Sequence, residues 1–98
     1  MGIEISDVVL ALKGRDSGKV FLVVGLEGDY ALIADGRGRR LEKPKKKKLR
    51  HLHPVGKSGV RISEKLRTGQ KVTNSDIRKE LAEGSQDVSG EKGGMQNG

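Results

Sequence analysis

The stretch VVLALKGRDSGKVFLVVG, residues 8–25, decides the fold. Two short apolar runs, at residues 8–12 and 20–24, flank the polar segment GRDSGK at residues 14–19. Short β-branched runs bounded by turn residues are typical of strands, and glycine reaches positive φ at no steric cost. The stretch therefore predicts two strands joined by a glycine loop, with Gly18 at a positive-φ bend and Phe21 pointing into the core.

A third strand and two weaker strand signals follow. The run YALIA at residues 30–34 comes after the turn signal EGD and ends at DGRG, so it predicts the third strand of an antiparallel meander. Arg40 and Leu41 predict a brief fourth strand. Residues 48–53 nearly alternate polar and apolar side chains and predict a last strand at a sheet edge, where lysines oppose aggregation.

The pattern changes to a helical one after Pro54. ISEKLRTG, residues 62–69, has apolar side chains four residues apart and predicts about two helical turns closed by its glycine. Thr73 and Asp76 have the spacing of a capping box, so a second helix is predicted from Thr73 to a glycine stop at Gly84. Residues 84–98 are rich in Gly and Ser and predict a disordered C-terminal tail.

The composition bounds the class of protein. Ninety-eight residues form at most one small domain. With one phenylalanine, one tyrosine and no tryptophan, its core must be built from Val, Leu, Ile and Ala. The absence of cysteine favours a reducing, intracellular location. No apolar run approaches the ~18–20 residues of a membrane span, and the acidic start MGIEISD is unlike a signal peptide. We therefore expect a cytoplasmic protein without membrane contact.

The positive charge is concentrated in the middle third of the chain. Residues 1–36 carry three basic and six acidic side chains (net −3), residues 37–72 carry fourteen and two (net +12), and residues 73–98 carry three and five (net −2). Within EKPKKKKLR at residues 42–50, six of the eight residues from Lys43 to Arg50 are cationic. A segment this polarised indicates a polyanionic partner.

The order of strand, G-x-x-x-G-K loop and apolar strand resembles the KOW motif of several ribosomal proteins and transcription factors. The closest likeness is to the fourteen-e type of large-subunit ribosomal protein, carried by Gly18-Lys19 through Val24 and by YALIADG at residues 30–36. The resemblance covers roughly residues 5–50 and extends to the small bacterial KOW-domain proteins that bind RNA. It implies a mainly β fold: a small SH3-like β-barrel over residues 4–55, a segment of one or two short helices over residues 56–83, and the tail at residues 84–98.

The residues themselves indicate where RNA would bind. Gly14 and Gly18 would let backbone N–H groups approach a phosphate closely, and cationic side chains surround the glycine loop and fill the segment after it. The predicted RNA-binding residues are Lys13, Arg15, Lys19, Arg37, Arg39, Arg40, Lys43, Lys45, Lys46, Lys47, Lys48 and Arg50. With only Phe21 and Tyr30 as aromatic side chains, phosphate contact and shape recognition of structured RNA are favoured over base stacking.

Other interpretations of the charge remain open. The lysines can act only as a solubilising strand edge, and PKKKKLR also fits a nuclear localisation signal. MGIEIS fits the myristoylation pattern, with the basic run as a second membrane signal. A protein-interaction module of the transcription or translation machinery is the alternative function, because KOW domains also bind proteins.

The sequence does not indicate an enzyme or a metalloprotein. GRDSGK lacks the spacing of a nucleotide-binding P-loop, and no nucleophile and base converge. His51 and His53, expected on one face of the last strand, lack the third ligand that a zinc site needs. We therefore expect no catalytic residue, cofactor, metal or small-molecule substrate. The expected partner is RNA linked to translation, ribosomal RNA above all, with ribosomal proteins beside it.

Overall fold

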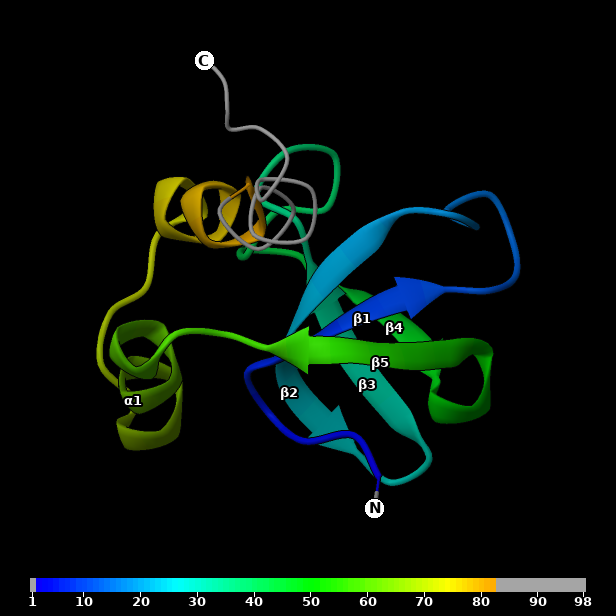
Figure 1. The fold of residues 1–98 in the computed structure, drawn as a ribbon, viewed down its shortest axis with the longest axis horizontal. Helices are drawn as coiled ribbons and strands as arrows, with labels where there is room; N and C mark the ends of the chain where they lie inside the picture. The colour runs from blue at the N-terminus through cyan, green and yellow to red at the C-terminus, as the bar shows by residue number, and fades with distance from the viewer. Residues whose placement is uncertain (1, 83–98) are drawn as a thin grey trace, which may run out of the picture.

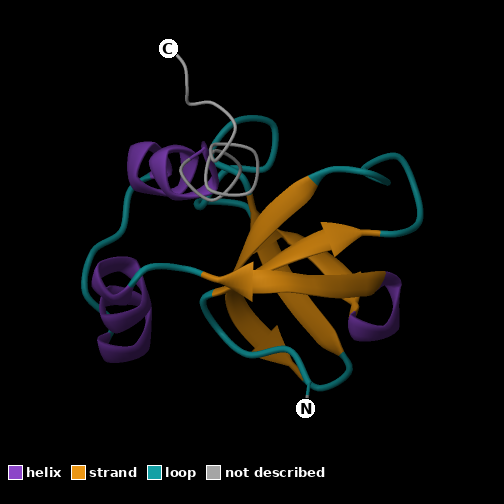
Figure 2. Cartoon of the chain, in the orientation of Figure 1, coloured by secondary structure: helices purple, strands orange, loops and turns teal. Residues whose placement is uncertain are grey.

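The computed structural model describes residues 2–82 and is mainly β, with helices that follow the sheet (Figures 1 and 2). The strands are β1 (Asp7–Ala11), β2 (Val20–Glu27), β3 (Tyr30–Ala34), β4 (Lys45–Lys48) and β5 (Leu52–Lys57). A 3-10 turn, η1 (Leu49–His51), separates the last two strands, α1 (Val60–Thr68) follows, and residues 74–82 are helical. In the part of the chain that is described, no helix is long and apolar enough to cross a lipid bilayer.

The five strands form one antiparallel sheet in the order β4-β3-β2-β1-β5. This confirms the predicted meander of β1, β2 and β3. The sheet is not closed, since within residues 2–82 no ladder joins β4 to β5 at its two edges. The register shifts between Val8 and Val9 and between Val23 and Gly25, and such irregularities increase the local twist of a sheet.

The first three strands lie where the apolar runs predict them. β3 matches the prediction at both ends, and Gly18 has the predicted positive φ, at 88°. β2 continues three residues past its predicted end, to Glu27. The continuation passes through Gly25, where a Cβ would lie 3.0 Å from the Leu32 Cδ1 atom, so the bulge brings the two strands close together.

The predicted fourth strand at Arg40 and Leu41 is wrong, because these residues form a turn. The Leu41 N–H donates to the side-chain oxygen Oδ1 of Asn74 at 2.7 Å, and the Arg40 carbonyl accepts the N–H of Lys43 at 3.0 Å. These backbone groups are therefore used outside any strand ladder. The strand that pairs with β3 is β4, the lysine run itself.

The single last strand predicted over residues 48–53 is also wrong. The chain instead leaves β4 at Lys48, turns through η1 and enters β5 at Leu52. This turn is necessary because β4 pairs with β3 at one edge of the sheet while β5 pairs with β1 at the other. Two backbone bonds fix it: the Leu49 N–H donates to the Asp29 carbonyl at 2.9 Å, and the Leu12 N–H donates to the His51 carbonyl at 2.9 Å.

The sheet has a buried cluster on each face. One cluster lies within the curved sheet and includes the fully buried Phe21, as predicted; its members are Val9, Ala11, Phe21, Val23, Ala31, Ile33 and Leu52. The other joins the sheet to the helices and contains Leu22, Ala34, Ile62, Val72, Ile77 and Leu81. Full burial of a side chain such as Ile77 stabilises the fold by about 1.5–3 kcal/mol. The helices are therefore part of the same packed unit as the sheet.

The helix signals correspond to real helix ends. α1 ends at Gly69, which has the left-handed φ of 77° expected of a glycine cap. The capping box at the second helix is confirmed: the Asp76 N–H donates to the Thr73 hydroxyl and the Thr73 N–H donates to the Asp76 carboxylate, both at 3.1 Å. β5 continues to Lys57, two residues past the expected barrel boundary. Gly84 and the predicted tail lie outside the described residues.

Candidate nucleic-acid interface

The glycine loop, residues 14–19, is a tight connection whose backbone is partly hydrogen-bonded to itself. Gly14 and Gly18 have positive φ, at 86° and 88°. The Gly18 N–H donates to the Ala11 carbonyl at 2.9 Å, and the Ala11 N–H donates to the Lys19 carbonyl at 3.0 Å. The Gly18 N–H therefore closes the hairpin, and any backbone donor that this loop offers to a phosphate must be another N–H group. Gly14 is exposed, and its carbonyl accepts the Ser17 N–H at 3.1 Å.

β4 is a strand made only of lysines, and its side chains alternate between the two faces of the sheet. Lys45 and Lys47 pair with Ile33 and Ala31, so they share the face of the cluster within the sheet. Both lysines are half-buried. Lysine stems can cover apolar surface while their ammonium groups stay in water, which explains how a run of lysines forms an edge strand.

The lysine strand and the glycine loop meet at a direct contact. The ammonium group Nζ of Lys47 donates a hydrogen bond of 2.8 Å to the Lys13 carbonyl. A Cβ built on Gly14 would lie 2.8 Å from the same Nζ atom. The absence of a side chain at Gly14 therefore leaves the space that the Lys47 ammonium occupies, and two basic segments more than thirty residues apart form one surface.

His51 shows that further cations gather at this place. It lies in η1, which is bonded to the end of β1 through the Leu12 N–H. Burial lowers the pKa of His51 below its ordinary value, and the neighbouring charges of Arg50, Lys13, Lys47 and Lys48 lower it further. We call this group the basic end of the sheet; its members are Lys13, Lys47, Lys48, Arg50 and His51.

The histidines do not form the pair that the sequence predicts. His51 belongs to η1 and His53 to β5, where it pairs with Leu10, so they do not share one strand face. Across residues 2–82, no three His, Cys, Asp or Glu side chains are placed to hold a metal ion. The lowered pKa of His51 reflects first its burial and then the positive charge around it.

The arginine turn, residues 35–40, is the second basic segment, and it is tied down from within. The carboxylate oxygen Oδ1 of Asp35 accepts the N–H groups of Arg37 at 2.8 Å and of Arg39 at 2.9 Å. The Arg39 guanidinium donates from Nε at 3.2 Å and from Nη2 at 2.9 Å to Oδ2 of Asp16, whose side chain is 10% exposed. Arg39 thus joins the turn to the glycine loop, and its positive charge is paired with a buried carboxylate.

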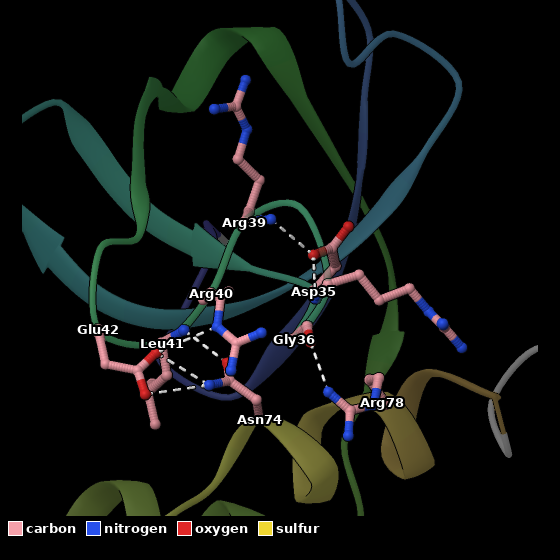
Figure 3. Close-up of polar contacts among 9 residues, drawn as sticks. Asp35, Gly36, Arg39, Arg40, Leu41, Glu42, Asn74 and Arg78 are labelled. Carbon is pink, nitrogen blue, oxygen red and sulfur yellow. Dashed lines mark hydrogen bonds and ion pairs between the residues drawn. The ribbon is translucent and has the colours of Figure 1, made fainter.

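The second helix holds the other side of the arginine turn (Figure 3). Arg78 donates from Nη1 to the Gly36 carbonyl at 2.7 Å. Asn74, which is buried, accepts the Leu41 N–H and donates to the Glu42 carboxylate at 2.9 and 3.2 Å. The bond from Asn74 is the main reason that the pKa of Glu42 is lowered. The turn is therefore bonded to both the sheet and the helix.

The side chains of the remaining predicted cations take no part in the contacts described for these two groups. Lys46 points to the opposite face from Lys47, where its Nζ lies 3.2 Å from the Glu27 carboxylate and 5.2 Å from the centre of the Tyr30 ring. Arg40 lies 3.7 Å from the Glu42 carboxylate. Lys45 is half-buried on the inner face of β4. Four of these remaining predicted residues are exposed and form no ion pair with the part of the chain that the structure describes: Arg15, Lys19, Arg37 and Lys43.

Three residues important to the site escape the sequence prediction. The sequence pattern places His51 in a strand, although its position beside a basic run is visible in the sequence. Asp16 and Asn74 form contacts with partners 23 and 33 positions away. No local pattern identifies such partners. Comparison with known proteins adds nothing to this geometry, since no protein-family model and no curated protein sequence matches the chain.

Proposed function

We propose that this chain is a non-enzymatic RNA-binding module whose basic end contacts the phosphates of structured RNA. The observation that carries the proposal is the 2.8 Å bond from the Lys47 ammonium to the Lys13 carbonyl. This hydrogen bond joins the glycine loop and the lysine strand into one surface, and both segments have residue types that suit phosphate binding. Lysine and arginine side chains that neutralise phosphates supply most of the affinity of such complexes.

The lowered pKa of His51 supports the same surface. Four cations act on one imidazole, and the mutual repulsion of like charges is unfavourable in the free protein. A phosphate backbone placed across these side chains would remove that repulsion. A surface built only for solubility gains nothing from gathering its charges at one end of a sheet.

The aromatic side chains support binding of structured RNA. Phe21 is fully buried, so Tyr30 is the only Phe, Tyr or Trp side chain of this protein that can meet a base. Proteins that bind single strands without sequence preference stack successive bases on several aromatic side chains. Phosphate contact and recognition of RNA shape fit this composition better.

The finer part of the proposal concerns the fold family and the RNA. We infer an SH3-like barrel of the KOW type that binds ribosomal RNA in the cytoplasm, with ribosomal proteins as neighbours. Support comes from the glycine loop between β1 and β2, with positive φ at both motif glycines. Further support is that β5, the last strand, returns to pair with β1, the first.

The test compares two double variants that remove the same charge from opposite ends of β5. Lys47→Gln with Lys48→Gln removes it from the basic end. Arg61→Gln with Lys71→Gln removes it from exposed positions in and after α1, beyond the other end of β5 (Figure 1). Affinity for a labelled RNA hairpin is measured at one fixed salt concentration, and each variant is also melted.

We expect the first variant to bind about tenfold or more weakly and the second to stay close to the parent. Equal losses would show that only net charge matters, and unchanged binding of the first variant would contradict the proposal. A stoichiometric protein complex that survives nuclease treatment would indicate the protein-interaction function instead.

A further inference from the structure

A hollow lies beside the basic end, on the far side of Lys48. It has a volume of about 340 Å³ and is lined by Asp29, Tyr30, Lys48, Leu49 and Arg50. One wall is fixed, because the Leu49 N–H donates to the Asp29 carbonyl at 2.9 Å and Tyr30 pairs with Lys48 across the β3–β4 ladder. Its size falls at the small end of the ~300–1,000 Å³ range of ligand sites, so it has room for a small ligand such as one nucleobase.

The lining combines three kinds of group that can bind parts of a nucleotide. Tyr30, half-buried, offers an aromatic ring for stacking. Lys48 and Arg50 offer positive charge for a phosphate, and both belong to the basic end. Asp29 is exposed at the rim and forms no ion pair with any residue in 2–82. A carboxylate is an unusual neighbour for a phosphate, so its presence points to recognition of a base.

The chemistry of Asp29 selects among the four bases. A carboxylate has only acceptor oxygens, two of them side by side. The Watson–Crick edge of guanine alone presents two adjacent donors, N1–H and the N2 amino group. Adenine, cytosine and uracil each place an acceptor beside their donor, and a carboxylate repels it.

We propose that the hollow takes one unpaired guanine of the bound RNA. Its ring stacks on Tyr30, its Watson–Crick edge donates to the Asp29 carboxylate, and its flanking phosphate lies between Lys48 and Arg50. Lys46 does not line the hollow; its Nζ atom lies 5.2 Å from the centre of the Tyr30 ring and 3.2 Å from the Glu27 carboxylate. This inference rests on the proposed function. It adds a base preference to a surface that otherwise contacts only phosphates.

The test uses RNA hairpins with one stem and a loop that differs at a single position, which is G, A, C or U. Affinities are measured for the parent, Asp29→Asn, Tyr30→Leu and the control Tyr30→Phe, which keeps an aromatic ring. The ratio of affinities for the G and A loops is compared, so that the charge change at Asp29 cancels. The chain has one tyrosine, so 3-fluorotyrosine labelling gives one ¹⁹F resonance that reports on the hollow.

The parent and Tyr30→Phe should prefer the G loop by about tenfold, and the ¹⁹F resonance should shift only with that loop. Asp29→Asn and Tyr30→Leu should bind all four loops alike while keeping salt-dependent affinity. Equal affinity of the parent for all loops overturns the guanine site and leaves the RNA-binding proposal standing. If both Asp29→Asn and Tyr30→Leu still prefer the G loop, the guanine is recognised elsewhere on the protein, and this result also overturns the proposed site. If no hairpin binds, the proposed function fails and the inference fails with it.

Discussion

The arginine turn and the basic end carry the same sign of charge but use it in opposite ways. In the arginine turn, the Arg39 guanidinium is held by the buried Asp16, and the backbone is bonded to Asp35, Asn74 and Arg78. At the basic end, burial and then the charges of four neighbouring cations lower the pKa of His51. In the first group, Arg39 has its counter-charge inside the protein, whereas Arg37 is exposed and Arg40 lies beside the exposed Glu42. The second group lacks a carboxylate within its own cluster.

We interpret this contrast as a separation between charge that holds the fold and charge available to the proposed partner. A cation bonded to a buried carboxylate is costly to remove, because the partner is left without its hydrogen bonds. A solvated ammonium at a strand edge contributes little to folding. We therefore expect changes in the arginine turn to lower stability and changes at the basic end to lower RNA affinity.

Gly36 should give the largest effect on the arginine turn. Its φ is 78°, and a Cβ there would collide with the Asn74 carbonyl oxygen and approach the Arg78 side chain. Gly36→Ala should cost at least about 1–3 kcal/mol from backbone strain alone, which corresponds to a fall of roughly 4–24 °C in the melting temperature. Gly38→Ala is the matched control, since nothing lies within 4 Å of its Cβ position. Equal melting temperatures of the two variants would contradict the claim that the arginine turn stabilises the fold.

Arg39 and Arg37 test the same turn with a pair of identical changes. Arg39→Gln removes both bonds to Asp16 and should lower the free energy of unfolding by about 1–3 kcal/mol. Arg37→Gln removes an exposed side chain and should stay within about 0.5 kcal/mol of the parent. Urea unfolding measures both. A stable Arg39→Gln protein would mean that this arginine is free for a partner after all.

The capping box should have a smaller effect, because it acts on the turn only through the second helix. Thr73→Ala removes the bond to the Asp76 N–H and should cost about 1 kcal/mol, whereas Ser75→Ala, at an exposed neighbour, should cost less. The Thr73 N–H lowers the pKa of Asp76 below its ordinary 3.8. The stability that ionised Asp76 gives to the folded protein is therefore fully present above pH 3.8. It is lost as the pH falls through the pKa of Asp76 in the folded state, which lies below 3.8. If Thr73→Ala melts like Ser75→Ala, the cap does not support the helix.

His51 should give the smallest effect, and it sharpens the other half of the comparison. Its pKa is lowered in the free protein by burial and by four cations. Phosphates at the basic end would screen those cations and raise the pKa, so binding would take up a proton. RNA affinity should then rise as the pH falls from about 7.5 to about 5.5, by at most about tenfold for each unit of pKa change. His51→Gln should flatten this dependence and His53→Gln should keep it; a flat parent profile would argue against phosphates at this site.

The sequence predicts the parts of this molecule that depend on neighbours in the chain. β3, the bend at Gly18 and the capping box at Thr73 follow from short apolar runs, glycine and a three-residue spacing. β4 could not be predicted, because lysine has little tendency to form strands. Its pairing depends on the free edge of β3 and on the cover that lysine stems give to the cluster within the sheet.

The candidate site shows the same limit. The positions of positive charge are visible in the sequence, and both basic segments can be identified from it. The sequence does not show which cations form ion pairs within the protein. Such pairs depend on contacts between distant positions, such as Arg39 with Asp16, 23 positions apart. The sequence therefore groups the arginine turn with the lysines, and only the fold separates them.

The salt dependence of RNA binding tests the central claim most directly. The parent is compared with the variant in which Lys45, Lys46, Lys47 and Lys48 are all replaced by Gln. We predict that the variant still folds, with a melting temperature below that of the parent because Gln covers less of the inner cluster and the Lys47 bond to the Lys13 carbonyl is lost, and that it binds every RNA more weakly. The slope of log affinity against log salt should flatten by ~0.7–0.9 for each phosphate that the variant no longer neutralises. An affinity at low salt equal to that of the parent would contradict the claim that the charge of β4 is there for RNA.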